Sequence, residues 1–194
     1  MSFLTRRMVI VAGLVLAAIA AAFALEFFLS PRPDQPFGHT QTGHAIGWAG
    51  LLLILLVFAY PIRKRFAKDR RWPKGWFQVH KAFGILGPML ILIHSGAHFH
   101  ALVPVLALIA MGLVVVSGIA GQVLHYLALR TLNEQRRELV QQGLSEAEIQ
   151  SRLHDLASRE EVFRLWQCIH APLTATFVVL MLMHIGGALY FGGL

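Results

Sequence analysis

The chain contains several apolar runs long enough to cross a lipid bilayer, and this feature restricts its fold more than any other. A helix rises about 1.5 Å per residue, so about 20 apolar residues cover the roughly 30 Å of hydrocarbon in a membrane. The runs cover residues 8–29, 45–62, 77–99, 102–129 and 163–191, of which the second is short and the fifth contains Pro172. They predict an all-α fold, an integral membrane bundle of five transmembrane helices.

Composition agrees with a chain whose main solvent is lipid. Hydrophobic residues make up 56% of it and charged residues only 14%, whereas a soluble domain carries about a quarter charged residues. Little sequence remains outside the apolar runs, so we expect residues 1–194 to form a single transmembrane domain. The sequence has no glycine-rich nucleotide loop and no CxxC pair. Flavin, nicotinamide or iron–sulfur chemistry would therefore have to come from another polypeptide.

The net charge of +7 is distributed as membrane topology requires, and we expect no nucleic-acid partner. Basic residues gather before the first run, between the second and third, and between the fourth and fifth, while only Arg32 lies on the other side. The loop between the second and third runs alone holds Arg63, Lys64, Arg65, Lys68, Arg70, Arg71 and Lys74. By the positive-inside rule the N-terminus is cytoplasmic and the C-terminus periplasmic, in a bacterial inner membrane.

The first apolar run also has features of a secretory signal, because Arg6 and Arg7 precede it and small residues occupy positions 20–22. The run continues through Leu29, which is longer than a typical signal core. We therefore expect an anchor. Cleavage would leave the topology of the remaining helices unchanged.

The polar segment 131–161 separates the fourth and fifth runs. Ser145 followed by Glu148 is typical of a capping box at the start of a helix. Apolar residues at helical spacing follow one face of this helix: Leu144, Ile149, Leu153 and Leu156. We expect a cytoplasmic amphipathic helix that folds back on the bundle or lies at the lipid headgroups. A docking face for a cytoplasmic partner is the alternative.

Four histidines inside the apolar runs carry the functional prediction. His80 and His94 are 14 positions apart in the third run, and His170 and His184 are 14 apart in the fifth. Fourteen residues make nearly four helical turns and a rise of roughly 21 Å, so each pair shares one helix face and spans most of the membrane. Because one helix separates the two runs, these runs are expected to be parallel, which brings His80 to the depth of His170 and His94 to that of His184.

This arrangement predicts two haem b groups, each with two axial imidazole ligands. His80 and His170 would ligate the cytoplasmic haem iron, and His94 and His184 the outer one. The alternative is that the histidines are satisfied by hydrogen bonds between helices. Gly87, midway between His80 and His94, is expected to leave bare backbone beside a macrocycle, although ordinary close helix packing would also use a glycine.

The other histidines are secondary candidates. His98, His100 and His44 lie toward the outer side and are candidate contacts for haem propionates, for a quinone headgroup or for a metal ion; plain interfacial histidines are the alternative. His125, near the cytoplasmic end of the fourth run, is the substitute if an inner ligand has been misassigned.

The paired histidines resemble those of cytochrome b in the quinol–cytochrome c reductases. Their placement on the third and fifth runs is more similar to the transmembrane domain of ferric reductases and NADPH oxidases. The resemblance covers the second to fifth runs through His80, His94, His170 and His184. The chain departs from the oxidase-like enzymes in lacking a sixth run and a flavin or nicotinamide domain. The resemblance implies an electron-transfer subunit of an oxidoreductase, whether or not the chain is itself an enzyme.

The expected partners are therefore redox partners within or beside the lipid bilayer. The electron donor would be a cytoplasmic flavoprotein or a membrane quinol, and the acceptor a quinone, an outer cytochrome or a metal ion. The competing prediction is a non-haem protein, such as a divalent-metal transporter that uses His94, His98 and His100. Such a transporter would need carboxylates within the membrane, and none lies deep in any run.

Overall fold

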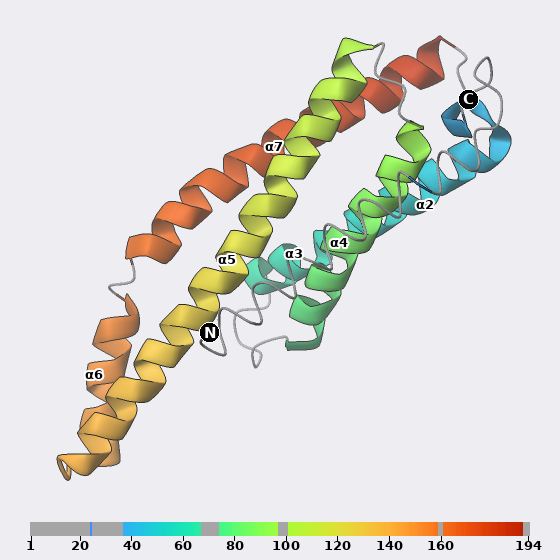
Figure 1. Cartoon of the computed structure of the whole chain (residues 1–194). Coiled ribbons are helices and arrows are strands. Elements are labelled where there is room, and N and C mark those ends of the chain that lie inside the picture. Colours follow the sequence, from blue (N-terminus) through green and yellow to red (C-terminus); the bar gives the residue numbers. More distant parts are fainter. Residues whose placement is uncertain (1–23, 25–36, 67–73, 97–100, 159–160, 192–194) are drawn as a thin grey trace. The chain divides into compact units, whose positions relative to one another are not determined.

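A computed structural model describes residue 24 and residues 37–66, 74–96, 101–158 and 161–191. Every regular element in this part of the chain is helical (Figure 1), so the all-α prediction is confirmed there. The elements are η1 (Phe37–His39), α2 (Gln41–Val57), α3 (Ala59–Phe66), α4 (Lys74–Ser95), α5 (Leu102–Gln141), α6 (Glu146–Ser158) and α7 (Glu161–Tyr190). The first expected span, residues 8–29, lies outside the described residues apart from Ala24.

Four helical stretches are long and apolar enough to cross a membrane: Gln41–Phe66, Gly75–Ser95, Leu102–Gln141 and Arg164–Tyr190. They correspond to the second to fifth apolar runs. Many of their large apolar side chains point outward; Leu52, Leu113 and Leu182, for example, are each at least half exposed. So much apolar surface would be costly in water but is suited to lipid. The chain is an integral membrane protein by these criteria.

Within the span that corresponds to the second apolar run, residues 45–62, the helix is interrupted once. The helix α2 ends at Val57, and the N–H of Phe58 donates to the carbonyl of Leu55 at 3.1 Å, which is the tighter bonding of a final turn. Pro61 explains the break, because it has no N–H to donate to the carbonyl four residues earlier, that of Val57. α3 then begins at Ala59.

Pro104 and Pro172 do not divide their helices. Pro104 lies in the first turn of α5, where an N–H has no partner within the helix. The helix α7 continues through Pro172 from Glu161 to Tyr190, although a proline inside a helix usually kinks or breaks it. A single helix therefore carries both His170 and His184.

The described chain divides into two compact units, residues 1–109 with 180–194 and residues 110–179. In the first unit, α2 packs along α4 (Figure 1). Glycines allow the two backbones to approach, since a Cβ on Gly50 would lie 2.9 Å from the Ile91 side chain and one on Gly87 would lie 3.0 Å from that of Ile54. Gly87 was expected to face a macrocycle. It faces α2, as the alternative of ordinary close helix packing predicted.

The end of α4 is fixed by a glycine with left-handed backbone. Gly96 has φ of +56°, and its N–H donates to the carbonyl of Ile93 at 3.3 Å. This conformation suits glycine and stops the helix, which explains why α4 ends before residue 99. Near this end, Phe37 and Ile93 form a buried cluster with Ile46, Leu90 and Leu92.

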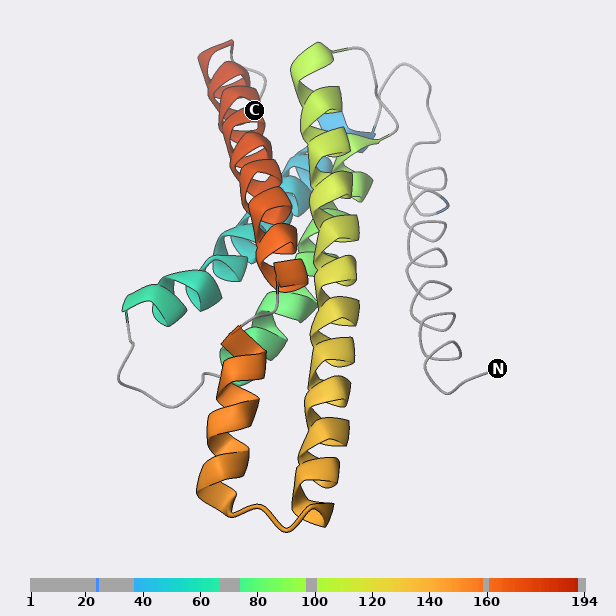
Figure 2. The same cartoon turned by 90° about the vertical axis from the view of Figure 1, so that its left-hand side faces the viewer.

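In the second unit, α5 extends to Gln141, 12 residues beyond the expected end of its apolar run at residue 129. Polar helix formers continue it, and Arg130 pairs with Glu134 one turn later at 2.7 Å. Gly143 then closes the helix with φ of +74°, and Leu144 N–H donates back to the Leu139 carbonyl at 3.3 Å. This combination is a Schellman turn, which reverses the chain into α6 (Figure 2).

The predicted capping box at Ser145 is confirmed. The backbone N–H and the hydroxyl of Ser145 both donate to Oε2 of Glu148, at 3.0 and 2.7 Å. These bonds lower the pKa of the Glu148 carboxyl, since they favour its charged form. Ile149, on the predicted apolar face of α6, is 1% exposed. Arg136 of α5 pairs with Glu146 of α6 at 2.8 Å, so the two arms of the hairpin are also linked through charge.

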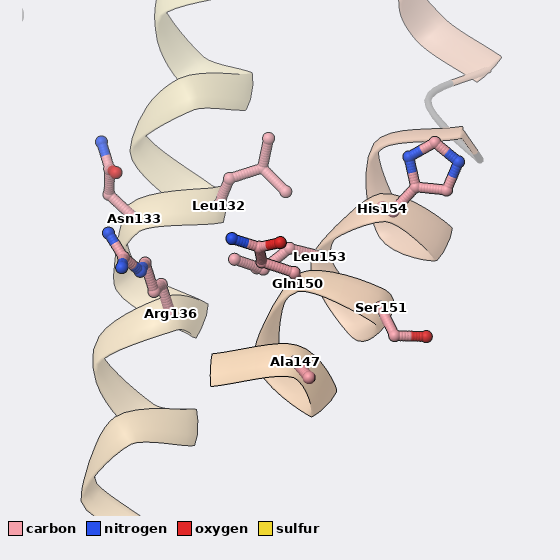
Figure 3. A pocket seen from close by; sticks show the side chains of 8 residues that line it. All are labelled: Leu132, Asn133, Arg136, Ala147, Gln150, Ser151, Leu153 and His154. Carbon is pink, nitrogen blue, oxygen red and sulfur yellow. The ribbon is translucent and has the colours of Figure 1, made fainter. Parts of the chain in front are cut away.

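An open groove of about 760 Å³ lies between these two arms (Figure 3). Its lining mixes polar and apolar side chains from both helices: Leu132, Asn133 and Arg136 from α5, and Ala147, Gln150, Ser151, Leu153 and His154 from α6. The groove lies on the segment for which a docking face was the alternative expectation. Docking there stays a prediction.

Candidate functional site

The two histidines of α4 make the same contact with α2. Nδ1 of His80 lies 2.9 Å from the carbonyl oxygen of Val57, and Nδ1 of His94 lies 2.9 Å from that of Gly43. The two carbonyls are 14 positions apart, as are the two histidines, and the order is reversed. The helices therefore run in opposite directions, and the spacing on α4 matches a spacing on its neighbour.

These contacts determine which ring nitrogen carries the proton. A carbonyl oxygen only accepts hydrogen bonds, so each Nδ1 must donate, and in the neutral imidazole Nε2 then keeps its lone pair. Because the two nitrogens diverge from the ring, Nε2 is directed away from the carbonyl. An imidazole that donates one N–H to a backbone carbonyl and offers the other nitrogen is the usual state of a metal-ligating histidine.

Pro61 leaves the acceptor of His80 without its usual helical donor. In a continuous helix the carbonyl of Val57 would accept the N–H of residue 61. Proline has no N–H. The Val57 carbonyl therefore lacks its helical donor, and it accepts from Nδ1 of His80. The ring of Tyr60 lies beside the same imidazole, with ring centroids 5.4 Å apart.

His94 packs directly against the backbone of α2 and has a second histidine beside it. A Cβ on Gly47 would lie 2.8 Å from Nδ1 and 2.9 Å from Cγ of His94, so the ring lies directly on bare backbone of α2. His44 of α2 is the next ring, with centroids 5.9 Å apart and planes inclined by 52°. His94 and His184, the two histidines expected at the outer site, both belong to the first compact unit.

His170 belongs to the second unit, where it packs against α5. Its ring stacks on Trp166, with centroids 4.9 Å apart, and Nδ1 lies 3.2 Å from the hydroxyl oxygen of Ser117. The indole N–H of Trp166 donates to the Ser117 carbonyl at 2.7 Å. A hydroxyl both donates and accepts, so this contact does not fix the tautomer of His170 as the carbonyls fix those of His80 and His94.

The secondary candidates have mixed outcomes. His44 contacts His94, whereas His98 and His100 lie outside the described residues. His125 lies in α5 with its side chain partly exposed. Within the described ranges, no three His, Cys, Asp or Glu side chains gather as they would around a bare metal ion. His98 and His100 lie outside those ranges, so this absence does not bear on the combination of His94, His98 and His100.

Sequence reasoning missed the two carbonyl acceptors, together with Gly47, Trp166 and Ser117. For one of them a signal was present, because a proline four residues after Val57 indicates an unsatisfied carbonyl there.

Comparisons with known protein families, with curated proteins and with solved structures give no match for this chain.

Proposed function

We propose that the chain is a b-type cytochrome that carries electrons across the membrane through two haems. His94 and His184 would be the axial ligands of the outer haem, and His80 and His170 those of the cytoplasmic haem. The observation that carries the proposal is the pair of hydrogen bonds from His80 and His94 to α2, which holds both imidazoles in the ligating tautomer at a 14-residue spacing.

The residues present fit this cofactor in two respects. An axial ligand needs a neutral imidazole on a rigid support, and α2 supplies that support for His80 and His94. The outer pair, His94 and His184, both belong to the first compact unit. The pairing of His80 with His170 rests on their spacing along α4 and α7. Gly87, which packs against α2, contributes nothing to the fit.

When bound, haem iron supplies one-electron redox chemistry, and the chain's own residues set the conditions for it. Imidazole orientation, the hydrogen bonds to Nδ1 and burial among apolar helices would tune the two potentials. The donor would be a cytoplasmic flavoprotein or a membrane quinol, and the acceptor a quinone, an outer cytochrome or a metal ion. His44 beside His94 is a candidate contact for propionates or a quinone at the outer side.

The alternative is a divalent-metal transporter that uses His94, His98 and His100. The tautomer of His94 would suit a metal ion as well as haem iron. The same bond at His80, roughly 21 Å away along α4, is outside such a cluster and favours two separate sites.

The test is a reduced-minus-oxidised visible spectrum of the purified full chain, with haem content measured as the pyridine complex. We expect two non-covalent b haems per chain, because the sequence has no CxxCH attachment motif. His80→Ala and His170→Ala should remove the same half of the absorbance, and His94→Ala and His184→Ala the other half.

The control for these variants is His125→Ala, which should keep both haems. A wild-type chain without haem would overturn the proposal. If His80→Ala and His170→Ala removed different components, the assignment of the cytoplasmic ligands would be wrong, and His125 would be the next candidate.

A further inference from the structure

The ring of His94 lies on a part of α2 that has no side chain. A Cβ on Gly47 would meet three atoms of the imidazole, Nδ1 at 2.8 Å, Cγ at 2.9 Å and Cε1 at 3.0 Å. Contacts this short essentially never occur at a real Cβ, so a side chain at this position would displace the ring.

The displaced ring could not keep its present hydrogen bond. Its acceptor, the carbonyl of Gly43, lies one turn before Gly47 on the same face of α2. Gly47 and Gly43 therefore act on the same edge of the His94 ring. The missing side chain of Gly47 allows the ring to approach α2, and the carbonyl of Gly43 fixes the rotation of the ring. At the other end of α4, His80 meets an aromatic ring, that of Tyr60, and the described contacts give no glycine the same role there.

We propose that Gly47 is a positioning residue for the outer redox site, because it admits the His94 ring to the Gly43 carbonyl and thereby directs Nε2 to the haem iron. This inference rests on the proposed function for the identity of the ligand at Nε2. The packing of the ring on Gly47 stands without it.

Gly50 provides the matched control on the same helix. A Cβ on Gly50 would lie 2.9 Å from Cδ1 and 3.1 Å from Cγ1 of Ile91 and 3.2 Å from Cβ of Leu90, which is a similarly close approach to apolar side chains. Gly47→Ala and Gly50→Ala therefore add the same methyl group to the same helix pair, and only the first meets a histidine.

The first experiment compares both variants of the full chain by redox titration and by electron paramagnetic resonance of the oxidised protein. Gly47→Ala should shift the potential and the resonance signal of one haem, or lose that haem and about half the absorbance, while the second haem keeps its wild-type values. The affected haem should be the one that His94→Ala removes. Gly50→Ala should leave both haems unchanged. Equal spectra and potentials for the two variants would overturn the inference.

The second experiment needs no haem. The melting temperature of the full chain is measured for Gly47→Ala alone, for His94→Ala alone and for the two together. Gly47→Ala should lower the melting temperature when His94 is present and change it little when His94 is alanine, because the ring that it displaces is gone. An equal loss in both backgrounds, or a double variant that fails to fold, would overturn the inference. A wild-type chain without haem would overturn the proposed function and leave this result to stand by itself.

Discussion

Pro61 acts on a histidine that lies 19 positions further along the chain. Its missing N–H leaves the carbonyl of Val57 without its helical donor, and Nδ1 of His80 donates to that carbonyl instead. Gly47 acts on His94 in a different way. It has no side chain, so the imidazole can lie directly against the backbone of α2. At the scale of single residues, each of the two histidines of α4 therefore depends on a residue of α2 or α3 that has no reactive side chain.

We predict that Pro61→Ala alters the environment of His80. The new N–H would compete for the Val57 carbonyl, and because that oxygen has two lone pairs we expect a weaker bond to His80 rather than its loss. Under the proposed function, the potential of one of the two proposed haems should shift while both remain bound. The free energy of unfolding should change by no more than about 1 kcal/mol, the net value of one hydrogen bond.

The control for Pro61→Ala is Ile62→Ala, since Ile62 is largely exposed and its N–H already donates to the Phe58 carbonyl. Redox titration of both variants, with nitrogen NMR of the histidine tautomers, checks the prediction. A potential that moves equally in the two variants would show that the missing N–H of Pro61 is not the cause.

The spacing of the histidines was visible in the sequence, but their hydrogen-bond acceptors were not. Every residue has a backbone carbonyl, so the residue types at Gly43 and Val57 do not indicate which carbonyl oxygen will accept a hydrogen bond from α4. Gly87 could be seen in the sequence, but its role could not be predicted, because a glycine on a helix face suits close packing of another helix as well as a cofactor. Here it packs on Ile54 of α2.

At the scale of elements, local signals with a stereochemical cause were the reliable ones. Ser145 and Glu148 predicted the start of α6, and the structure has that cap. The end of α5 was not predictable from hydropathy, because polarity shows where a helix leaves lipid and not where it stops. Gly143, with its left-handed backbone, provides the actual stop.

We predict that Ser145→Ala frays the first turn of α6. Loss of the cap should cost the helix about 1 kcal/mol, equivalent to roughly fivefold faster hydrogen exchange of the first amides. Hydrogen exchange followed by mass spectrometry over residues 146–158 is the measurement, and Ser151→Ala on the same helix is the control. Unchanged exchange in Ser145→Ala would mean that the hairpin, rather than the cap, holds this turn.

The effect of Ser145→Ala should also depend on pH. The pKa of Glu148 is lower in the folded helix than in the unfolded chain. The stabilisation is therefore fully present above the ordinary glutamate pKa, about 4.3, and is lost as the pH falls through the lowered value. The exchange difference between wild type and variant should shrink over that acidic range.

At the scale of the whole molecule, the sequence predicted the second to fifth spans, and four helices of the required length and composition correspond to them. Which side of the membrane each end faces is a separate matter, decided by charge outside the helices. The exposed basic residues of α3, Arg63, Lys64 and Arg65, continue the basic loop that favours a cytoplasmic position.

We predict opposite signals from reporters at two positions. A reporter fused after Leu194 should be active only outside the cytoplasm, and one inserted near Gly143, in the turn between α5 and α6, only inside it. Pairs of reporters with complementary requirements, one active on each side, provide the control at each position. The reverse pattern would exchange the cytoplasmic and outer assignments of the two haems.

The paired bonds between α2 and α4 also have a mechanical consequence. Since both lie in the same register, sliding α4 along α2 would stretch the two bonds together, and turning α4 about its axis would swing the two imidazoles in the same sense. His80 and His94 are thus coupled over roughly 21 Å by a stiff strut of two helices. A rotation of α4 at one membrane face would therefore also move the imidazole near the other face.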